Sequence, residues 1–318
     1  MNEERRFENV KEFAQYVAEH LFDENSAMKE NHHVEVKEVV KNNGLVLTGL
    51  IIKEDDVNIA PTLYMNQGYE MYLKGRDIES LIESYLCTYE ESRLSNDFSV
   101  EFFMDFDKVK DRLMLKLINA ASNVDMLTEC PHLILGDLAV IFQVKIDTLA
   151  YGNATITVKK EHAKIWNVGT ATLLTCAKLN METRERFNIQ PMMEVIAGMM
   201  GLTVDEAIEM GADIPMFVMS NESKINGATG LIFTEKLQSF AEMHDCNLII
   251  LPSSIHEILI VLDKGGMDIA SLTEIVKAIN TSEVSPEEVL SNSVYYYDRN
   301  AHELQMADTK EKIEIKIA

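Results

Sequence analysis

The strongest constraint on the fold is a β-hairpin pattern near the N-terminus. Residues Val34–Val40 alternate apolar and polar side chains, and residues Leu45–Ile52 resume an apolar run. Between them lies Asn42-Asn43-Gly44, whose residue types tolerate the positive φ angles of a tight hairpin turn. A second pattern of this kind joins Val294–Tyr297 to Glu303–Met306. Both patterns predict antiparallel pairing of neighbouring strands.

Helical patterns are interleaved with these hairpins. Apolar residues recur at helical spacing from about Phe7 to Phe22, and Asp77 is placed to cap a helix from Ile78 to about Glu91. In the second half, Pro191 suits the first position of a helix that ends at Met200. The regular strand-helix-strand alternation of a doubly wound sheet is absent from the sequence, so we expect an α+β fold.

Capping and turn residues in the second half predict further helices and strands. Thr203 with Glu206 and Ser271 with Glu274 have the spacing of capping boxes, which predicts a helix start at each. A shorter helix is expected from Ser285-Pro286-Glu287-Glu288. The clearest strand pattern is Asn247–Leu251, a turn at Pro252-Ser253-Ser254, and Ile255–Leu262. All of these elements belong to the second half of the protein.

The length predicts two lobes, because 318 residues exceed what one compact core usually holds. We expect an N-terminal α+β lobe over residues 1–150, a C-terminal α+β lobe over residues 151–306 and a charged tail over residues 307–318. Strands at Arg112–Asn119 and Leu138–Ile146 would complete the N-terminal sheet. The tail is expected to form either a late edge strand or a frayed end.

Charge narrows the classes of partner. The chain has 29 basic and 52 acidic residues, a formal net charge of −23. Nucleic-acid binders concentrate Lys and Arg, so direct binding to DNA, RNA or an anionic membrane is not expected. An alternative is that the carboxylates mimic a nucleic acid and bind a DNA-binding protein. The simpler explanation is that the charge keeps the protein soluble and monomeric.

The sequence predicts a cytoplasmic protein without a cofactor. The N-terminus is charged and lacks the apolar run of a secretory signal, and the chain contains no stretch of 18 uncharged apolar residues. Cys87, Cys130, Cys176 and Cys246 lie far apart and form no CxxC pair, so we expect reduced thiols that are mostly buried. Neither a phosphate-binding glycine motif nor a metal-ligand spacing is present.

Several segments resemble a known family. They share turn-forming or apolar residues at fixed places along nearly the whole chain: Asn43-Gly44-Leu45, Pro61-Thr62-Leu63-Tyr64, Leu117-Ile118-Asn119, Asn226-Gly227-Ala228, Leu251-Pro252-Ser253-Ser254-Ile255-His256-Glu257, Ser285-Pro286-Glu287-Glu288-Val289-Leu290-Ser291 and Val294-Tyr295-Tyr296-Tyr297-Asp298. This pattern is similar to an uncharacterised bacterial family of gut anaerobes that is described as a domain of unknown function. The resemblance implies an intracellular bacterial protein and supplies no catalytic residue.

Ser254, His256 and Glu257 are the weak catalytic candidates, because Ser, His and Glu are the parts of a hydrolytic triad. On a strand, side chains two positions apart lie roughly 6 to 7 Å from each other, too far for a hydrogen bond between nucleophile and base. The segment also begins like a zinc-protease motif, but Ile260 stands where the second His is required. The alternative interpretation is a tight turn whose hydroxyls satisfy backbone groups.

Methionines form the last feature of interest. Eight of the 18 Met residues fall between Met181 and Met219. Met192, Met193, Met199 and Met200 are the weak binding candidates, because Met-rich helices can form adaptable protein-binding surfaces. The alternative is that they fill an irregular core. Taken together, the sequence favours a non-enzymatic protein-interaction or regulatory protein, with a hydrolase at Ser254/His256/Glu257 and a nucleic-acid mimic as alternatives.

Overall fold

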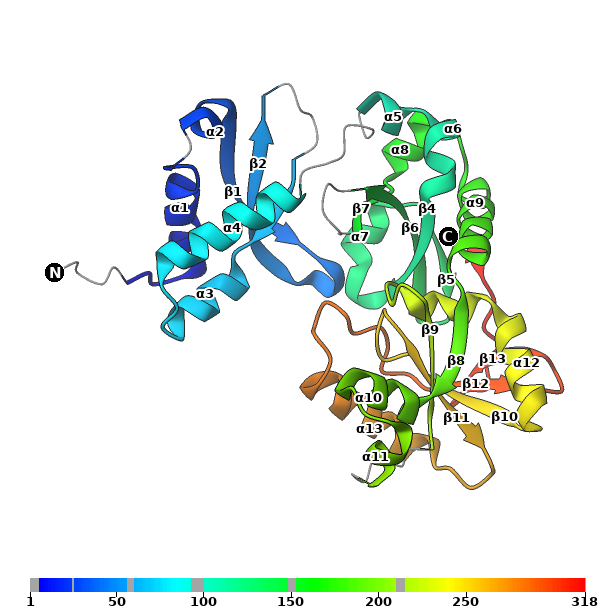
Figure 1. The fold of residues 1–318 in the computed structure, drawn as a ribbon. Coiled ribbons are helices and arrows are strands. Elements are labelled where there is room, and N and C mark those ends of the chain that lie inside the picture. The colour runs from blue at the N-terminus through cyan, green and yellow to red at the C-terminus, as the bar shows by residue number, and fades with distance from the viewer. Residues whose placement is uncertain are drawn as a thin grey trace. The chain divides into compact units, whose positions relative to one another are not determined.

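The structure is a computed structural model that describes residues 6–24, 26–55, 60–92, 100–147, 153–209 and 215–317. Helices alternate with three sheets, and the strand pairs within these sheets whose registers are described are antiparallel, so the α+β prediction is confirmed (Figure 1). The chain divides into two compact units, Met1–Val109 with Lys145–Ile156, and Lys110–Val144 with Thr157–Ala318. This division lies near residue 109, whereas the sequence suggested one near 150, where residues 148–152 lie outside the described part.

The first unit contains a three-stranded sheet of order β1-β2-β3. β1 (His32–Val40) and β2 (Val46–Glu54) pair from His32↔Glu54 to Val40↔Val46. The turn between them is η1 (Asn42–Gly44), where Asn43 has a φ of 60° and Gly44 a φ of 71°. The predicted hairpin is therefore confirmed. Pro61 precedes the short edge strand β3 (Thr62–Tyr64), which pairs with β2.

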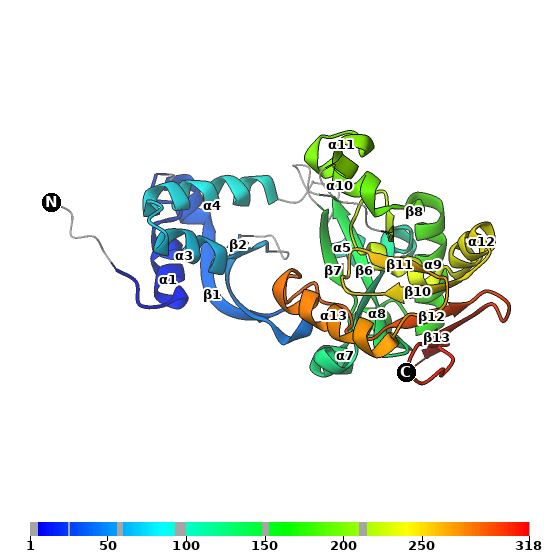
Figure 2. The ribbon, with the colours of Figure 1, turned by 90° about the horizontal axis from the view of Figure 1, so that it is seen from below.

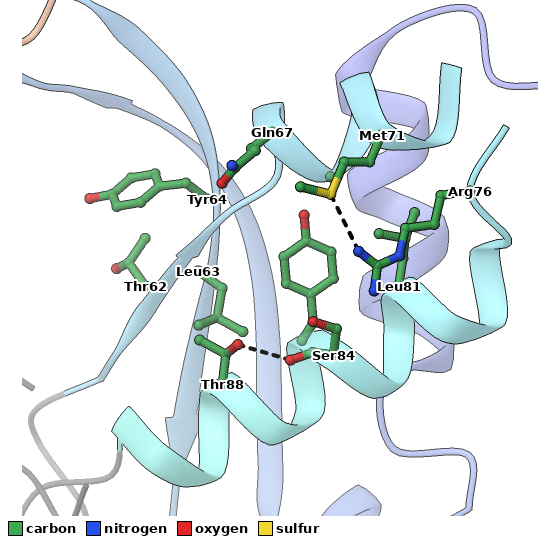
Figure 3. Close-up of a pocket in the computed structure, with 11 residues that line it drawn as sticks. Thr62, Leu63, Tyr64, Gln67, Met71, Arg76, Leu81, Ser84 and Thr88 are labelled. Atoms are coloured by element: carbon green, nitrogen blue, oxygen red, sulfur yellow. Dashed lines mark hydrogen bonds between the residues drawn. The ribbon is translucent and has the colours of Figure 1, made fainter. Parts of the chain in front are cut away.

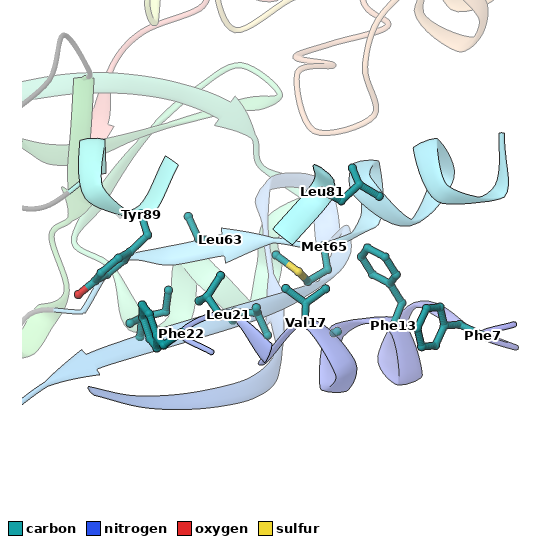
Figure 4. Close-up of a cluster of buried hydrophobic side chains, with 12 residues drawn as sticks. Phe7, Phe13, Val17, Leu21, Phe22, Leu63, Met65, Leu81 and Tyr89 are labelled. Carbon is teal, nitrogen blue, oxygen red and sulfur yellow. The ribbon is translucent and has the colours of Figure 1, made fainter. Parts of the chain in front are cut away.

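The core of the first unit lies between its helices and the sheet (Figure 4). α1 (Val10–His20) starts at Asn9, whose side chain accepts a hydrogen bond from the Glu12 N–H. Phe13 and Val17 on its inner face are fully buried and pack with Leu50 of β2 and Leu81 of α4 (Ile78–Ser92). The remaining helices of the unit are α2 (Ser26–Asn31), α3 (Asn66–Leu73), α5 (Val100–Met104) and α6 (Phe106–Val109).

The second unit begins with a separate sheet of order β14-β5-β6-β4, with β7 also on β6. Its strands are β4 (Leu113–Asn119), β5 (His132–Leu135), β6 (Leu138–Asp147) and β14 (Lys316–Ile317). The end of β6 from Lys145, and β7 (Asn153–Thr157) up to Ile156, are counted with the first unit. We expected β4 and β6 to complete the N-terminal sheet. They instead pair with each other in a sheet separate from that of β1, β2 and β3. α9 (Thr170–Arg184) contacts β4, as does η4 (Gly227–Ile232).

The tail ends as an edge strand, one of the two alternatives, with Lys316 opposite Ile134. The short helices that connect this sheet are η2 (Lys110–Arg112), η3 (Ala121–Asn123), α7 (Val124–Glu129) and α8 (Lys160–Ile165). Asn180 of α9 donates from its amide to the carbonyls of Lys110 and Leu113, at 2.7 and 2.9 Å. The helix is thereby fixed to the start of β4.

The second unit also contains a six-stranded sheet of order β13-β12-β10-β11-β9-β8. Its strands are β8 (Phe187–Pro191), β9 (Phe217–Asn221), β10 (Asn247–Leu251), β11 (Ile258–Asp263), β12 (Tyr295–Asp298) and β13 (Glu303–Met306). α12 (Thr234–His244) contacts β10, and α13 (Ile269–Ser282) is a further helix of this unit (Figure 2). Leu272 and Val276 of α13 pack with Ile249 and Val261 of the sheet.

Three local predictions differ from the structure. Pro191 is the last residue of β8, where it lies opposite Phe217 of β9. The helix α10 (Met192–Met200) therefore begins one residue later than predicted. α13 begins before Ser271, since Asp268 accepts from the Ala270 N–H and serves as its cap. The segment from Ser285 forms a turn rather than a helix, with the Glu288 N–H donating to the Ser285 carbonyl.

Candidate functional site

The Ser254 hydroxyl serves the backbone of its own turn. Ser254 is buried between β10 and β11, and its Oγ accepts a hydrogen bond from the His256 backbone N–H at 3.1 Å. This is the arrangement in which a serine side chain closes a turn two residues long. The interpretation of the segment as a turn whose hydroxyls satisfy backbone groups thus describes the contact that the structure contains.

The His256 ring is held by partners that the sequence did not indicate. The Asn226 backbone N–H donates to His256 Nδ1 at 3.4 Å. Nε2 of the same ring lies 3.5 Å from Glu288 Oε1, whereas the triad hypothesis named Glu257 as the carboxylate. Glu288 is far along the chain, and no local spacing connects it with His256. The described contacts therefore place the histidine between a carboxylate and a backbone amide.

The surroundings of this turn are tightly packed. A Cβ on Gly227 would lie 2.2 Å from both the His256 carbonyl oxygen and Ser220 Oγ, so only glycine fits there. Ser220 Oγ donates to the His256 carbonyl at 2.8 Å. The Asn226 side-chain amide donates to Oε1 of the Gln143 side chain at 3.0 Å, and both side chains are buried. Hydrogen bonds around this turn thus connect β9, the start of η4 and β6. We call this set of contacts the His256 turn contacts.

Three of the segments that carry the family resemblance contact one another at this turn, namely Asn226–Ala228, Leu251–Glu257 and Ser285–Ser291. The Leu290 N–H donates to the Ser253 carbonyl, the Ser291 N–H to the Pro252 carbonyl and the Ile255 N–H to the Glu288 carbonyl, all at 2.8 to 2.9 Å. The Ala228 N–H donates to the Ile255 carbonyl at 3.2 Å. The resemblance therefore rests in this region on residues that hold segments of the second unit together.

Asp137 accepts a second group of hydrogen bonds, from the residues that follow Leu290. Its carboxylate accepts from Ser291 Oγ at 2.6 Å, from Ser293 Oγ at 2.9 Å and from the Tyr295 hydroxyl. Tyr295 is fully buried, and burial, with the Asp137 charge beside it, raises the pKa of its phenol well above the ordinary value. The carboxylate lies in the β5–β6 turn and Tyr295 in β12, so this cluster joins the two sheets of the second unit.

The methionine candidates divide between core and surface. Met193 is buried with Ala197 and Ala207, where α10 contacts α11 (Val204–Glu209). Met192 is half-buried. Met199 and Met200 lie at the end of α10 with 78% and 54% of their surfaces exposed. The α10–α11 pair thus buries one methionine to hold its helices together and presents two to solvent.

α11 also exposes apolar residues. Val204 and Ile208, four positions apart on one helix face, are 38% and 45% exposed. We call Met199, Met200, Val204 and Ile208 the α10–α11 apolar surface. Local geometry supports it: Gly201 ends α10 with a φ of 67°, and the predicted capping box is confirmed by the Thr203 N–H on Glu206 (2.7 Å) and the Glu206 N–H on Thr203 Oγ1 (3.3 Å).

Acidic side chains accompany this surface. Glu194, Asp205, Glu206 and Glu209 are exposed, and residues 187–209 include no Lys, Arg or His. The Thr203 backbone N–H and hydroxyl both donate to Glu206 and lower the pKa of that carboxyl, so it is charged at neutral pH. The surface therefore combines exposed thioethers with exposed carboxylates from the same two helices.

The cysteines carry no sign of activated chemistry. The four thiols are free, with Cys130 buried, Cys176 and Cys246 half-buried and Cys87 exposed, so the expectation that most are buried is not met. The Glu91 charge raises the pKa of the Cys87 thiol, and burial raises the pKa of the Cys130 thiol, which keeps both protonated. Within the described ranges, no group of three His, Cys, Asp or Glu side chains is arranged to hold a metal ion. Nor is any described helix long and apolar enough to cross a membrane.

Comparison with known proteins gives one match. No curated protein and no solved structure is similar to this chain. The resemblance noted in the sequence is confirmed as a family relationship, while the bacterial origin implied by it stays a prediction. Residues 10–299 match the model described as a family of unknown function (DUF5688), and the chain belongs to that family.

Proposed function

We propose that this protein is a non-enzymatic, cytoplasmic interaction protein that binds a basic amphipathic helix of a partner on the α10–α11 apolar surface. The observation that carries the proposal is the exposure of Met199 and Met200 at the end of α10, together with the exposure of Val204 and Ile208 in α11, the helix that α10 contacts. Thioether side chains are flexible and polarizable, so they adapt to the apolar face of a bound helix.

Charge complementarity selects the partner. The acidic residues of α10 and α11, with no cation between residues 187 and 209, favour a helix that carries Lys and Arg beside its apolar face. The net charge of −23 disfavours a nucleic acid or an anionic membrane as the direct partner. Free cysteines suit a reducing compartment.

The test is binding of a designed peptide to the full-length protein. The probe is a fluorescent peptide of Leu and Lys whose Leu residues recur at helical spacing, and its control is a scrambled peptide of equal composition. We expect the patterned peptide to bind more tightly, because only it can present an apolar stripe to the methionines. Anisotropy titrations at low and high salt measure the two affinities.

Matched variants locate the binding. Replacing Met199 and Met200 together by Gln should weaken binding about tenfold or more, since the loss of two apolar contacts exceeds the ~1.4 kcal/mol that a tenfold change represents. Met243→Gln is the control, because Met243 on α12 is also 78% exposed. Equal affinities for the patterned and scrambled peptides, or equal losses in both variants, would contradict the proposal. Salt-labile binding without dependence on Met199 and Met200 would instead favour nucleic-acid mimicry.

A further inference from the structure

The first unit contains a pocket that the interaction surface does not use. It has a volume of about 380 Å³ and lies among β3, α3 and α4 (Figure 3). Tyr64, Gln67, Met71, Arg76, Ser84 and Tyr85 contribute to its lining. Pockets of this size are large enough for a small organic molecule.

The pocket wall is built around Gly68. The Tyr85 hydroxyl accepts a hydrogen bond from the Gly68 N–H in the first turn of α3. A Cβ on residue 68 would lie 1.9 Å from that hydroxyl oxygen, so the absence of a side chain is what admits the ring. Burial raises the pKa of Tyr85 to about 12, so the phenol is neutral near pH 7 and can still donate its proton. The wall is therefore preformed and includes a hydrogen-bond donor.

One cation, Arg76, lines the pocket together with apolar side chains. Leu63 and Leu81 are buried, and the Met71 side chain also lines the pocket (Figure 3). The Arg76 guanidinium contacts the Met71 sulfur at 3.6 Å, a weak acceptor. Among the ion pairs found in the described residues, none includes Arg76, although the chain has 52 acidic residues. The guanidinium is thus available to an anionic group from outside.

We infer that this pocket binds a small organic monocarboxylate with an aromatic or aliphatic body. The planar fork of Arg76 matches a carboxylate through two parallel hydrogen bonds. A single cation balances a single negative charge, which favours a carboxylate over a doubly charged phosphate monoester. The body of the ligand lies over Leu63, Leu81 and Met71, and the Tyr85 hydroxyl supplies an additional donor.

The test uses ligand-observed NMR on the full-length protein with a matched pair of probes. 4-Phenylbutyrate carries the required charge, and 4-phenylbutanamide has the same body without it. We expect saturation transfer to the carboxylate and at least about tenfold weaker binding of the amide, because only the carboxylate forms the charge-assisted contact. Equal binding of both probes, or binding of neither at millimolar concentration, would overturn the inference.

Variants separate the charge from the cavity. Arg76→Gln should weaken carboxylate binding about tenfold and leave amide binding unchanged. Ser84→Phe, at an exposed position of α4 that lines the pocket, should block both probes. The controls are Arg186→Gln, an exposed Arg of the second unit, and Cys87→Phe, an exposed α4 position outside the lining. Loss of binding in either control, or none in Arg76→Gln, would contradict the assignment. Peptide binding at the α10–α11 apolar surface is expected to remain in all four variants.

Discussion

At the residue scale, two glycines in helices have opposite constraints. Gly68 in α3 faces the Tyr85 hydroxyl, with the Cζ atom of that ring 2.8 Å from an added Cβ. Gly198 in α10 has no atom within 4 Å of an added Cβ. Alanine is favoured over glycine in helices by about 1 kcal/mol, so packing alone distinguishes the two sites.

The prediction is that Gly68→Ala lowers the free energy of unfolding by about 1–2 kcal/mol, because overpacking and the displaced tyrosine outweigh the helix propensity. Gly198→Ala should raise it by up to about 1 kcal/mol. Urea denaturation of the two variants measures both changes. If Gly68→Ala instead raises the free energy of unfolding, the Tyr85 ring does not pack against residue 68 as described.

A second prediction at this scale concerns Tyr295. Its folded pKa is raised above the unfolded value of 10.0, so its protonated form contributes stability that is complete below pH 10 and is lost as the pH rises through the folded pKa. Tyr295→Phe removes the hydrogen bond to Asp137 and should cost about 1–3 kcal/mol at neutral pH. Phenylalanine does not titrate, so the stability difference between wild type and variant should narrow above pH 10.

Denaturation of both proteins between neutral pH and pH 11.5 checks this prediction. Tyr64→Phe is a control, because Tyr64 lies in the first unit and accepts a hydrogen bond from Lys41 at its half-buried hydroxyl. A constant difference between wild type and Tyr295→Phe across the pH range would mean that the phenol does not keep its proton in the folded state.

At the scale of elements, local patterns predicted what local interactions determine. The β1–β2 hairpin follows from Asn43 and Gly44, which adopt the positive φ angles of the turn. The capping box at Thr203 follows from the two reciprocal bonds in which the Thr203 N–H donates to the Glu206 carboxylate and the Glu206 N–H donates to Thr203 Oγ1. β8 was not predicted as a strand, since Phe187–Pro191 becomes one by pairing with β9 across intervening helices. The sheet to which β4 and β6 belong likewise depends on which strands they meet in the fold, which local sequence patterns do not specify.

The candidate sites show the same distinction between features that local sequence predicts and features that depend on contacts between distant residues. The sequence indicated that methionines gather near α10, but burial of Met193 and exposure of Met199 depend on how α11 folds back. The turn at Ser254 was recognisable from Pro252 and the two serines. Its histidine partner Glu288 was not, because the contact joins residues brought together only by the fold. The Arg76 pocket gave no motif, since its lining comes from β3, α3 and α4 at irregular spacing.

At the scale of the whole molecule, the excess of carboxylates should make stability depend on salt. A net charge of −23 produces self-repulsion that disfavours the compact state, and salt screens it with a Debye length of about 10 Å at 0.1 M. The described ion pairs act in the opposite sense, because salt also weakens attractive pairs such as Lys312 with Glu303 and Glu314. Exposed pairs contribute only about 0–1 kcal/mol each, so repulsion should dominate.

We therefore expect the free energy of unfolding to rise as sodium chloride increases from low to moderate concentration. The double variant Glu19→Gln with Glu182→Gln removes two exposed carboxylates that belong to none of the ion pairs described, and it should be more stable than wild type at low salt and respond less to added salt. Replacing Glu303 and Glu314 by Gln also removes two charges but breaks the pairs with Lys312. Urea titrations across a salt series distinguish the cases. If added salt lowers the stability of wild type, attraction within the ion pairs outweighs repulsion, and the negative charge does not destabilise the fold.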